Sequence, residues 1–368
     1  MITLESRHLQ ANSERKMLAL VCERYGGPDM LKLAAIAKPV PKPDEILVRV
    51  AASSITSGDR RIRSLDMPYG FGILGRLALG WNGPRNTVLG ATFAGLVQAV
   101  GQRAKGFKAG DAVFGINGFR MGAHAEYLCM PATGAVTYKP AYVSFEQAAA
   151  LPFGGGTALS LLRRAKLQPG ETVLVNGAAG NVGMAAVQLA RTMGCMVTGV
   201  CSEEHLDRVR SLGATRVMDY RQEDFTGTGH RFDVVFDVAC NHTVSRCLDV
   251  LNPDGRIIRL QAGLPEMCHA MLRPRRAGRQ VLVGTAEERA DQLSDLSELV
   301  GQGIFRPVIA QVFPFSEAIA AHRFADTSRQ CGSVVLKMNI VTPEPPLRAY
   351  PPPVAGDSVQ ADLQILAP

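Results

Sequence analysis

Long apolar runs, secretory signals and paired cysteines are all missing from this sequence. No segment of its 368 residues approaches the ~20 consecutive apolar residues that a membrane-spanning helix needs. Residues 1–16 lack the apolar core of a secretory signal, and we expect them to form a flexible extension. The 8 cysteines include no C-x-x-C pair and no metal-ligand spacing, which argues against a disulfide scaffold and a zinc ribbon. We therefore expect a cytoplasmic protein with free thiols and no membrane partner.

Charge and hydrophobicity are those of a globular protein. Hydrophobic residues make up 46% and charged residues 20% of the chain, and 368 residues suggest roughly two domains. The formal net charge of +7 suits a cofactor that carries phosphates. A basic cluster at residues 273–279 could contact nucleic acid or another anionic surface, although a solvated loop is the commoner use of such a cluster. We expect no nucleic-acid partner.

The residue pattern divides the chain into segments. Residues 17–145 read as short strands and turns, which indicates a β-rich domain, and the glycine-rich apolar stretch 68–86 is interpreted as a functional loop. Between residues 146 and 305, strand-like runs alternate with helical ones, which predicts an α/β domain with a doubly wound parallel sheet. Residues 306–340 return to β-like runs that we expect to complete the first domain. The proline-rich residues 341–368 predict a disordered tail, with a docking segment as the alternative.

Six short strands are predicted in the parallel sheet. Arg259 is an exception among their apolar residues, because strands of a parallel sheet are buried on both faces. A position at the strand end, facing a cleft, would accommodate its charge. The predicted strands are 173–176, 196–200, 216–220, 233–238, 256–260 and 280–284.

The central feature of the chain is a strand, a glycine-rich turn and a helix. The apolar run 172–175 is followed by Gly177, Gly180 and Gly183, after which apolar residues recur at helical spacing. Ala178 replaces the first glycine of the usual G-x-G-x-x-G pattern. Turn glycines let the backbone approach a ligand, and a helix start offers free N–H groups and a positive dipole end. The motif predicts a pyrophosphate site, with an ordinary strand–helix turn as the alternative.

A series of motifs runs in a fixed order from about Met17 to Met338. The motifs lie at residues 53–59, 89–90, 94–95, 100–101, 107–115, 125–127, 148–152, 157–158, 177–183, 212–214 and 219–220. Together they resemble the medium-chain dehydrogenase/reductase superfamily, in its zinc-free quinone-oxidoreductase-like branch. The resemblance implies a GroES-like β-barrel domain and a Rossmann domain with a six-stranded parallel sheet. It also implies an active site in the cleft between them, and a homodimer.

A metal site is not expected. The zinc alcohol dehydrogenases of that superfamily carry a His-Glu pair after the glycine that corresponds to Gly90, whereas this chain has Ala91 and Thr92, which are not usual zinc ligands. His124 and Cys129 are interpreted as a structural pair. Without a metal, carbonyl polarisation must come from hydrogen bonds. This favours hydride delivery to a quinone or an enone, in which the developing charge is spread.

Three side chains are the candidates for substrate binding and catalysis. Relatives often carry asparagine at the position of Thr56 and tyrosine at that of Arg61, close to the nicotinamide and the substrate. Thr56 can still donate a hydrogen bond, and Arg61 could hold an anionic or enolate oxygen, with a solvated arginine as the alternative. Tyr69 is a further donor candidate, with a packed aromatic as its alternative.

The choice between NADPH and NADH depends on the end of the second parallel strand, where an acid would bind the ribose hydroxyls and repel a 2′-phosphate. The strand ends in Ser202, which suits a phosphate. The resemblance implies that His205 occupies a position where relatives that use NADPH often carry lysine, and that Tyr220 lines the same pocket. Against this, glutamates follow at 203–204, although acids also suit the first turn of a helix. We predict NADPH, with NADH as the alternative.

The resemblance also places Thr157 beside the nicotinamide ribose, and a helix N-cap is the other role that this residue could have. The predicted cofactor-binding residues are Thr157, Gly177, Ala179, Gly180, Asn181, Val182, Gly183, Ser202, His205, Tyr220, Val238 and Gly284.

The sequence therefore predicts a zinc-independent, NADPH-dependent oxidoreductase that reduces a small quinone or α,β-unsaturated carbonyl. One alternative is an NADPH-binding regulatory protein with weak catalysis, because the asparagine and tyrosine of relatives are missing. Another is an alcohol dehydrogenase that works without zinc.

Overall fold

The computed structural model describes residues 16–261, 263, 275–276, 278–284, 287–327 and 330–339. The predicted N-terminal extension (apart from Lys16), the proline-rich tail and part of the basic cluster lie outside these residues. No helix within them is long and apolar enough to cross a membrane.

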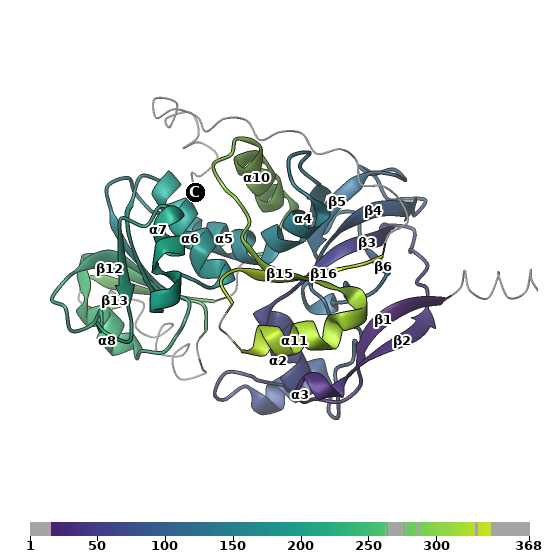
Figure 1. Ribbon diagram of the computed structural model, residues 1–368, viewed down its shortest axis with the longest axis horizontal. Helices are drawn as coiled ribbons and strands as arrows, with labels where there is room; N and C mark the ends of the chain where they lie inside the picture. The colour runs from purple at the N-terminus through teal and green to yellow at the C-terminus, as the bar shows by residue number, and fades with distance from the viewer. Residues whose placement is uncertain are drawn as a thin grey trace, which may run out of the picture.

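Two seven-stranded sheets lie side by side in the molecule (Figure 1). The first is largely antiparallel, with the strand order β15-β16-β3-β4-β5-β7, and β6 also pairs with β3. The C-terminal strand β16 pairs with β3, so the chain returns to this sheet after the second domain. A separate hairpin, β1 (Lys16–Cys22) and β2 (Leu31–Ala37), packs beside it. The strands of the sheet are β3 (Glu45–Ile55), β4 (Thr92–Val100), β5 (Ala112–Ile116), β6 (Tyr127–Pro131), β7 (Val136–Tyr138), β15 (Ile309–Pro314) and β16 (Ser333–Lys337).

The second sheet contains all six predicted parallel strands. Its order is β10-β9-β8-β11-β12-β14, which in chain order is 3-2-1-4-5-6, the doubly wound order of dinucleotide-binding folds. The short strand β13 adds an antiparallel edge that the sequence did not predict. The strands are β8 (Thr172–Asn176), β9 (Met196–Cys201), β10 (Arg216–Asp219), β11 (Phe232–Asp237), β12 (Leu251–Arg259), β13 (Arg275–Arg276) and β14 (Arg279–Val283).

Helices cover the sheets and join them. One core extends from β3 through α4 and α5 to one face of the second sheet, while Leu174 and Val235 pack into a second core on its other face. The α-helices are α2 (Ser57–Ser64), α3 (Gly72–Leu79), α4 (Phe145–Leu151), α5 (Thr157–Arg164), α6 (Asn181–Thr192), α7 (Leu206–Ser211), α8 (Val244–Asp249), α10 (Ala290–Gly301) and α11 (Ala318–Asp326). Shorter helical turns are η1 (Pro28–Met30), η2 (Gly118–Arg120), η3 (Pro152–Gly156), η4 (Glu203–His205) and η5 (Phe315–Glu317).

The prediction of a loop at 68–86 was wrong in its centre, where α3 forms. Its leucines, alanine and arginine favour a helix. Gly75 is the buried residue of this helix, and a Cβ there would lie 2.7 Å from the Cγ atom of Met67, so that the Met67 side chain would have to move.

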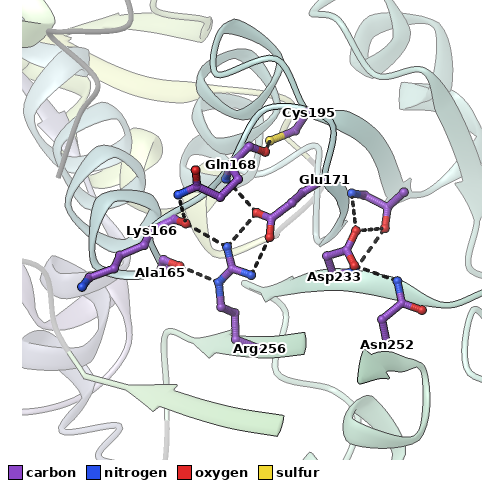
Figure 2. A network of polar contacts seen from close by, with 9 residues as sticks. Ala165, Lys166, Gln168, Glu171, Cys195, Asp233, Asn252 and Arg256 are labelled. Carbon is purple, nitrogen blue, oxygen red and sulfur yellow. Dashed lines mark hydrogen bonds and ion pairs between the residues drawn. The ribbon is translucent and has the colours of Figure 1, made fainter. Parts of the chain in front are cut away.

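A polar network fastens the amino-terminal edge of the second sheet (Figure 2). Arg256 of β12 forms a bidentate ion pair with Glu171, at 2.7 and 2.8 Å. Its guanidinium also donates to the carbonyl oxygens of Ala165 and Lys166, just after α5. Glu171 in turn accepts the backbone N–H of Gln168. One arginine therefore joins the end of α5, the start of β8 and the middle of the sheet.

Replacing Arg256 with leucine should lower the free energy of unfolding by about 2 kcal/mol, because Glu171 and two carbonyl groups lose their partner in a half-buried setting. Urea unfolding measures this loss. The matched control is Arg246→Leu, which removes an exposed ion pair with Asp224 and should cost less than about 1 kcal/mol. Equal losses in the two variants would contradict the structural role of Arg256.

Candidate active site

The glycine turn between β8 and α6 brings strand and helix into close contact. Gly177 has φ +85°, so the tight turn lies at Gly177, while Ala178 is fully buried. A Cβ at Gly183 would lie 2.1 Å from the carbonyl oxygen of Gly177, so a side chain there would push α6 away from β8. A Cβ at Gly180 would meet no atom closer than 3.5 Å, so the turn is open on that side.

The residues of this turn fit the pyrophosphate of a nicotinamide dinucleotide. Gly180 is the N-cap of α6, and no side chain caps the helix. The first N–H groups and the positive end of the helix dipole are therefore available to an anion. Val238 lies against the same turn, with its Cβ atom 3.4 Å from the position of a Cβ at Gly177. The turn lies at the carboxyl ends of β8 and β11, where the strand order reverses and dinucleotides bind in this fold.

A cation that the sequence analysis missed lies beside the predicted 2′-phosphate site. Ser202 is 8% exposed at the end of β9, and its side chain hydrogen-bonds the Glu204 carboxylate. Arg221 pairs with that carboxylate at 3.2 Å and lies over the ring of Tyr220 at 5.6 Å. The signal was present in the sequence, because Arg221 directly follows a predicted cofactor residue. His205 ends η4 close by and is half-buried.

Thr157 lies in a continuous helical segment formed by α4, η3 and α5. The alternative role of Thr157 as an N-cap is wrong, because Gly156 before it already has helical dihedral angles and η3 is a turn of π-helix. π-turns within helices are frequent at functional sites. A Cβ at Gly154 would lie 2.1 Å from Oδ1 of Asn181, so this turn packs directly on the start of α6. The contact between Thr157 and the nicotinamide ribose stays a prediction.

A line of buried polar side chains crosses the carboxyl ends of β8, β11 and β12. Asn176, Asp237 and Arg259 are in register on the three strands. Nδ2 of Asn176 donates to Oδ1 of Asp237 at 2.8 Å, and Nε of Arg259 lies 3.7 Å from Oδ2 of that carboxylate. Arg259 also donates to the carbonyl oxygen of Cys240. The predicted strand-end position of Arg259 is therefore confirmed, and Asp237 compensates its charge. Gly284 follows β14 at the same edge and lies near Arg164.

Arg61 lies in α2 of the first domain. It is half-buried, and burial lowers the pKa of its guanidinium, with smaller effects from Asp66, Arg60 and the thiol of Cys240. Cys240 belongs to the loop after β11. Arg61 remains a cation at neutral pH.

Thr56 and Tyr69 occupy different settings. Thr56 is 5% exposed and caps α2: its hydroxyl group donates to Oδ2 of Asp59 at 2.6 Å and accepts the N–H of Asp59. Oδ1 of Asp59 accepts the N–H of Gly90, so the cap also holds the loop before β4. Tyr69 is 83% exposed and precedes α3. Arg61 is thus half-buried whereas Tyr69 is exposed, and the catalytic roles of the three side chains stay predictions.

Comparison with known proteins agrees with this geometry. Residues 42–140 match the family model of the alcohol dehydrogenase GroES-like domain, and residues 212–336 match that of a zinc-binding dehydrogenase. A quinone oxidoreductase of Sus scrofa is 32% identical over 335 residues, covering 85% of this chain and 94% of the relative. The NADPH-dependent alkenal/one oxidoreductase of Arabidopsis thaliana is 31% identical over 340 residues, covering 89% and 81% of the two chains.

The chain belongs to the medium-chain dehydrogenase/reductase superfamily, in its quinone-oxidoreductase-like branch. It is an oxidoreductase of the medium-chain reductase type. The solved structure of a quinone oxidoreductase from Coxiella burnetii superimposes with a TM-score of 0.79 at 28% identity, covering 88% of this chain and 100% of that one. The predicted fold class, a GroES-like domain with a Rossmann domain, is confirmed.

The position of the zinc ligands in this superfamily is occupied here by other groups. Ala91 and Thr92 are buried, and the Thr92 carbonyl accepts the hydroxyl proton of Ser53. Nδ1 of His124 lies 2.8 Å from the same Ser53 oxygen. Gly90 has φ +96° and a Cβ there would lie 2.3 Å from the backbone nitrogen of His124. In the part of the chain that the structure describes, no group of three or more His, Cys, Asp or Glu side chains could hold a metal ion.

Two buried histidines hold the base of α2. His124 and His322 of α11 lie edge to face, with ring centroids 5.3 Å apart. Arg63 donates to Nδ1 of His322 and pairs with Asp326. Burial lowers the pKa of both rings; Asp59 partly opposes the shift at His124, while His124 and Arg63 add to it at His322. Both rings are therefore neutral in the folded protein at neutral pH.

The stability should decrease as the pH falls below about 6.5, the ordinary pKa of histidine. The unfolded chain binds protons there that the buried rings do not, so each ring contributes a slope of up to ~1.4 kcal/mol per pH unit. Urea unfolding from about pH 7.5 to about pH 5 measures this slope, which His322→Gln should reduce. The exposed His230→Gln is the control. An unchanged slope in His322→Gln would contradict the assignment.

Proposed function

We propose that the protein is a zinc-independent oxidoreductase that uses NADPH to reduce a quinone or an α,β-unsaturated carbonyl compound. The observation that carries this proposal is the open dinucleotide turn at Gly177–Gly183, which lies at the carboxyl edge of the sheet where the strand order reverses. The names of the relatives support it, since the Sus scrofa protein is a quinone oxidoreductase and the Arabidopsis thaliana protein an NADPH-dependent alkenal/one oxidoreductase.

The residues of the chain would hold the cofactor and the acceptor in separate ways. The N–H groups at the start of α6 bind the pyrophosphate, and Thr157 orients the ribose near the reacting end. When bound, the nicotinamide supplies a hydride to the acceptor. Arg61 stabilises the oxygen anion that develops on the acceptor. Because Arg61 is half-buried, water screens its charge less and the stabilisation is stronger. Thr56 acts as a positioning residue, because its hydroxyl proton is already committed to Asp59.

NADPH is favoured over NADH by the groups near Ser202. Ser202 offers a hydroxyl group, Arg221 a cation and Tyr220 a flat surface, and these suit a 2′-phosphate. Glu204 competes for Arg221, so binding of NADPH would replace one ion pair with another. A homodimer and a cytoplasmic location stay predictions.

The purified, chelator-treated protein should oxidise NADPH when an enone or a quinone is added, followed by loss of nicotinamide absorbance. Arg61→Ala should lower kcat/KM about 100-fold with unchanged NADPH affinity, because it removes one stabilising group of the developing anion. The matched control is its neighbour Arg60→Ala, which should change kcat/KM less than about twofold.

Turnover that requires added zinc would contradict the zinc-independent reaction. Tight NADPH binding without oxidation by any enone or quinone would favour the regulatory alternative. Equal activity of the Arg61 and Arg60 variants would remove Arg61 from the site.

The cofactor assignment is tested by Arg221→Ala. This variant should weaken NADPH binding about tenfold and leave NADH binding within about twofold, because only the 2′-phosphate loses a partner. The control is Arg216→Ala, which removes an exposed ion pair between Arg216 at the start of β10 and Glu223. Fluorescence titration with both cofactors gives the affinities. A wild-type protein that binds NADH more tightly than NADPH would overturn the assignment.

A further inference from the structure

A group of large apolar side chains lies exposed around α3. We call Tyr69, Ile73, Leu74, Leu77, Trp81 and Phe119 the α3 patch. They are exposed by 83%, 71%, 54%, 57%, 60% and 75% respectively. Scattered apolar residues on a surface need no explanation, but a contiguous group of them marks a contact surface. Five of the six come from thirteen consecutive residues of one segment, 69–81.

The helix is held at its carboxyl end, and its apolar side chains point outward. Gly75 is the buried residue of α3, and Leu79 is partly buried. The hydroxyl group of Tyr25 donates to the carbonyl oxygen of Gly80, and the N–H of Arg85 to that of Leu79. Ile73, Leu74 and Leu77 have the spacing of one helix face. In Figure 1, α3 lies at the lower edge of the molecule, outside both sheets.

Arginines surround the patch. Arg76 donates to the carbonyl oxygen of Trp81, and Arg85 to that of Leu77, so both guanidinium groups lie at the end of α3. Arg24 is close to the same turn, since its Cα atom is 3.2 Å from the position of a Cβ at Gly83. Arg120 follows Phe119, and the amide group of Asn86 donates to both of their carbonyl oxygens.

The charge of this surface is mainly positive. Residues 67–91 contain no acidic residue. Two nearby acids are already paired, Glu23 with Lys32 and Asp66 with Arg60. A third, Glu288, lies beside Gly118, and burial raises the pKa of its carboxyl group. Among the described residues, none of the four arginines Arg24, Arg76, Arg85 and Arg120 forms an ion pair. The surface thus presents apolar side chains together with cations that have no anionic partner within that part of the chain.

We propose that the α3 patch binds a lipid membrane that carries anionic headgroups. Apolar and aromatic side chains on a projecting helix, edged by arginines, match an interfacial membrane contact. A ligand pocket would be concave and would shield these side chains, whereas each of them is more than half exposed. A second copy of the chain fits less well, because a twofold contact would place the arginines of two patches against each other.

The inference is independent of the proposed reaction, since it uses no residue of the cofactor turn. It also changes the expectation of no membrane partner, which rested on the absence of a spanning segment. A peripheral contact needs no such segment.

Trp81 is the single tryptophan of the chain and reports on the patch directly. The full-length protein should sediment with vesicles of phosphatidylglycerol and phosphatidylcholine, and much less with phosphatidylcholine alone. Bound protein should show a blue shift of Trp81 emission and quenching by brominated acyl chains. Raising the salt concentration should release it.

Two variants separate the apolar contribution to vesicle binding from the electrostatic one. The triple variant Ile73→Ser, Leu74→Ser and Leu77→Ser should lower the partition coefficient at least about tenfold, because it removes the side chains that enter the lipid. Arg24→Gln with Arg120→Gln should lower it about fivefold per arginine on anionic vesicles. The matched control is Val40→Ser with Met196→Ser, which removes apolar side chains exposed by 84% and 50% away from the patch.

Failure of the wild type to sediment with anionic vesicles would overturn the proposal. So would equal binding of the triple variant and the wild type, or unchanged Trp81 emission in the bound state. Loss of a dimer in the triple variant, with no vesicle binding by the wild type, would instead assign the patch to a contact between copies. Unchanged NADPH affinity in the triple variant and in the arginine variant would confirm that the glycine turn between β8 and α6 is intact.

Discussion

The fully buried carboxylate of Asp59 is the constraint on which the start of α2 and the loop before β4 depend. A buried carboxylate is costly unless hydrogen bonds replace its water. Three donors do so here: the N–H and the hydroxyl group of Thr56, and the N–H of Gly90. Those bonds fix the start of α2 and the loop before β4 at the same point. The hydrogen bonds that satisfy the Asp59 carboxylate therefore also fix the direction of α2 and the position of Arg61.

The glycine turn of the second domain is determined by close packing rather than by charge. α6 can begin against β8 because Gly183 lets the helix backbone meet the carbonyl group of Gly177. This contact leaves the N–H groups of α6 at the carboxyl edge of the sheet. The buried line Asn176, Asp237 and Arg259 then gives that edge its polarity. The two predicted parts of the site are thus organised differently, the start of α2 by one carboxylate and the start of α6 by glycines.

The sequence predicted the features that depend on local pattern. The six parallel strands were found because short apolar runs alternate with helical periodicity, and the glycine turn because its spacing is local. Of the features it missed, one depends on a distant partner and two depend on neighbours along the chain. The charge of Arg259 is explained by Asp237, which lies on another strand but in register with it. The hydroxyl group of Thr56 was expected to be free, but Asp59 uses its proton. The alternative role of Thr157 as an N-cap was wrong because helical structure continues from η3 into α5 without a break.

The exposed helix α3 could not be predicted for a related reason, since a sequence does not show which apolar residues the fold leaves uncovered. α2 and α3 are joined by a short segment that begins at Leu65, where φ is +53° and α2 ends. The residue proposed to hold the acceptor and the surface proposed to meet lipid are therefore neighbours along the chain. The two proposals nevertheless rest on separate observations, the exposed side chains of α3 and the half-buried guanidinium group of Arg61, so that either can fail without the other.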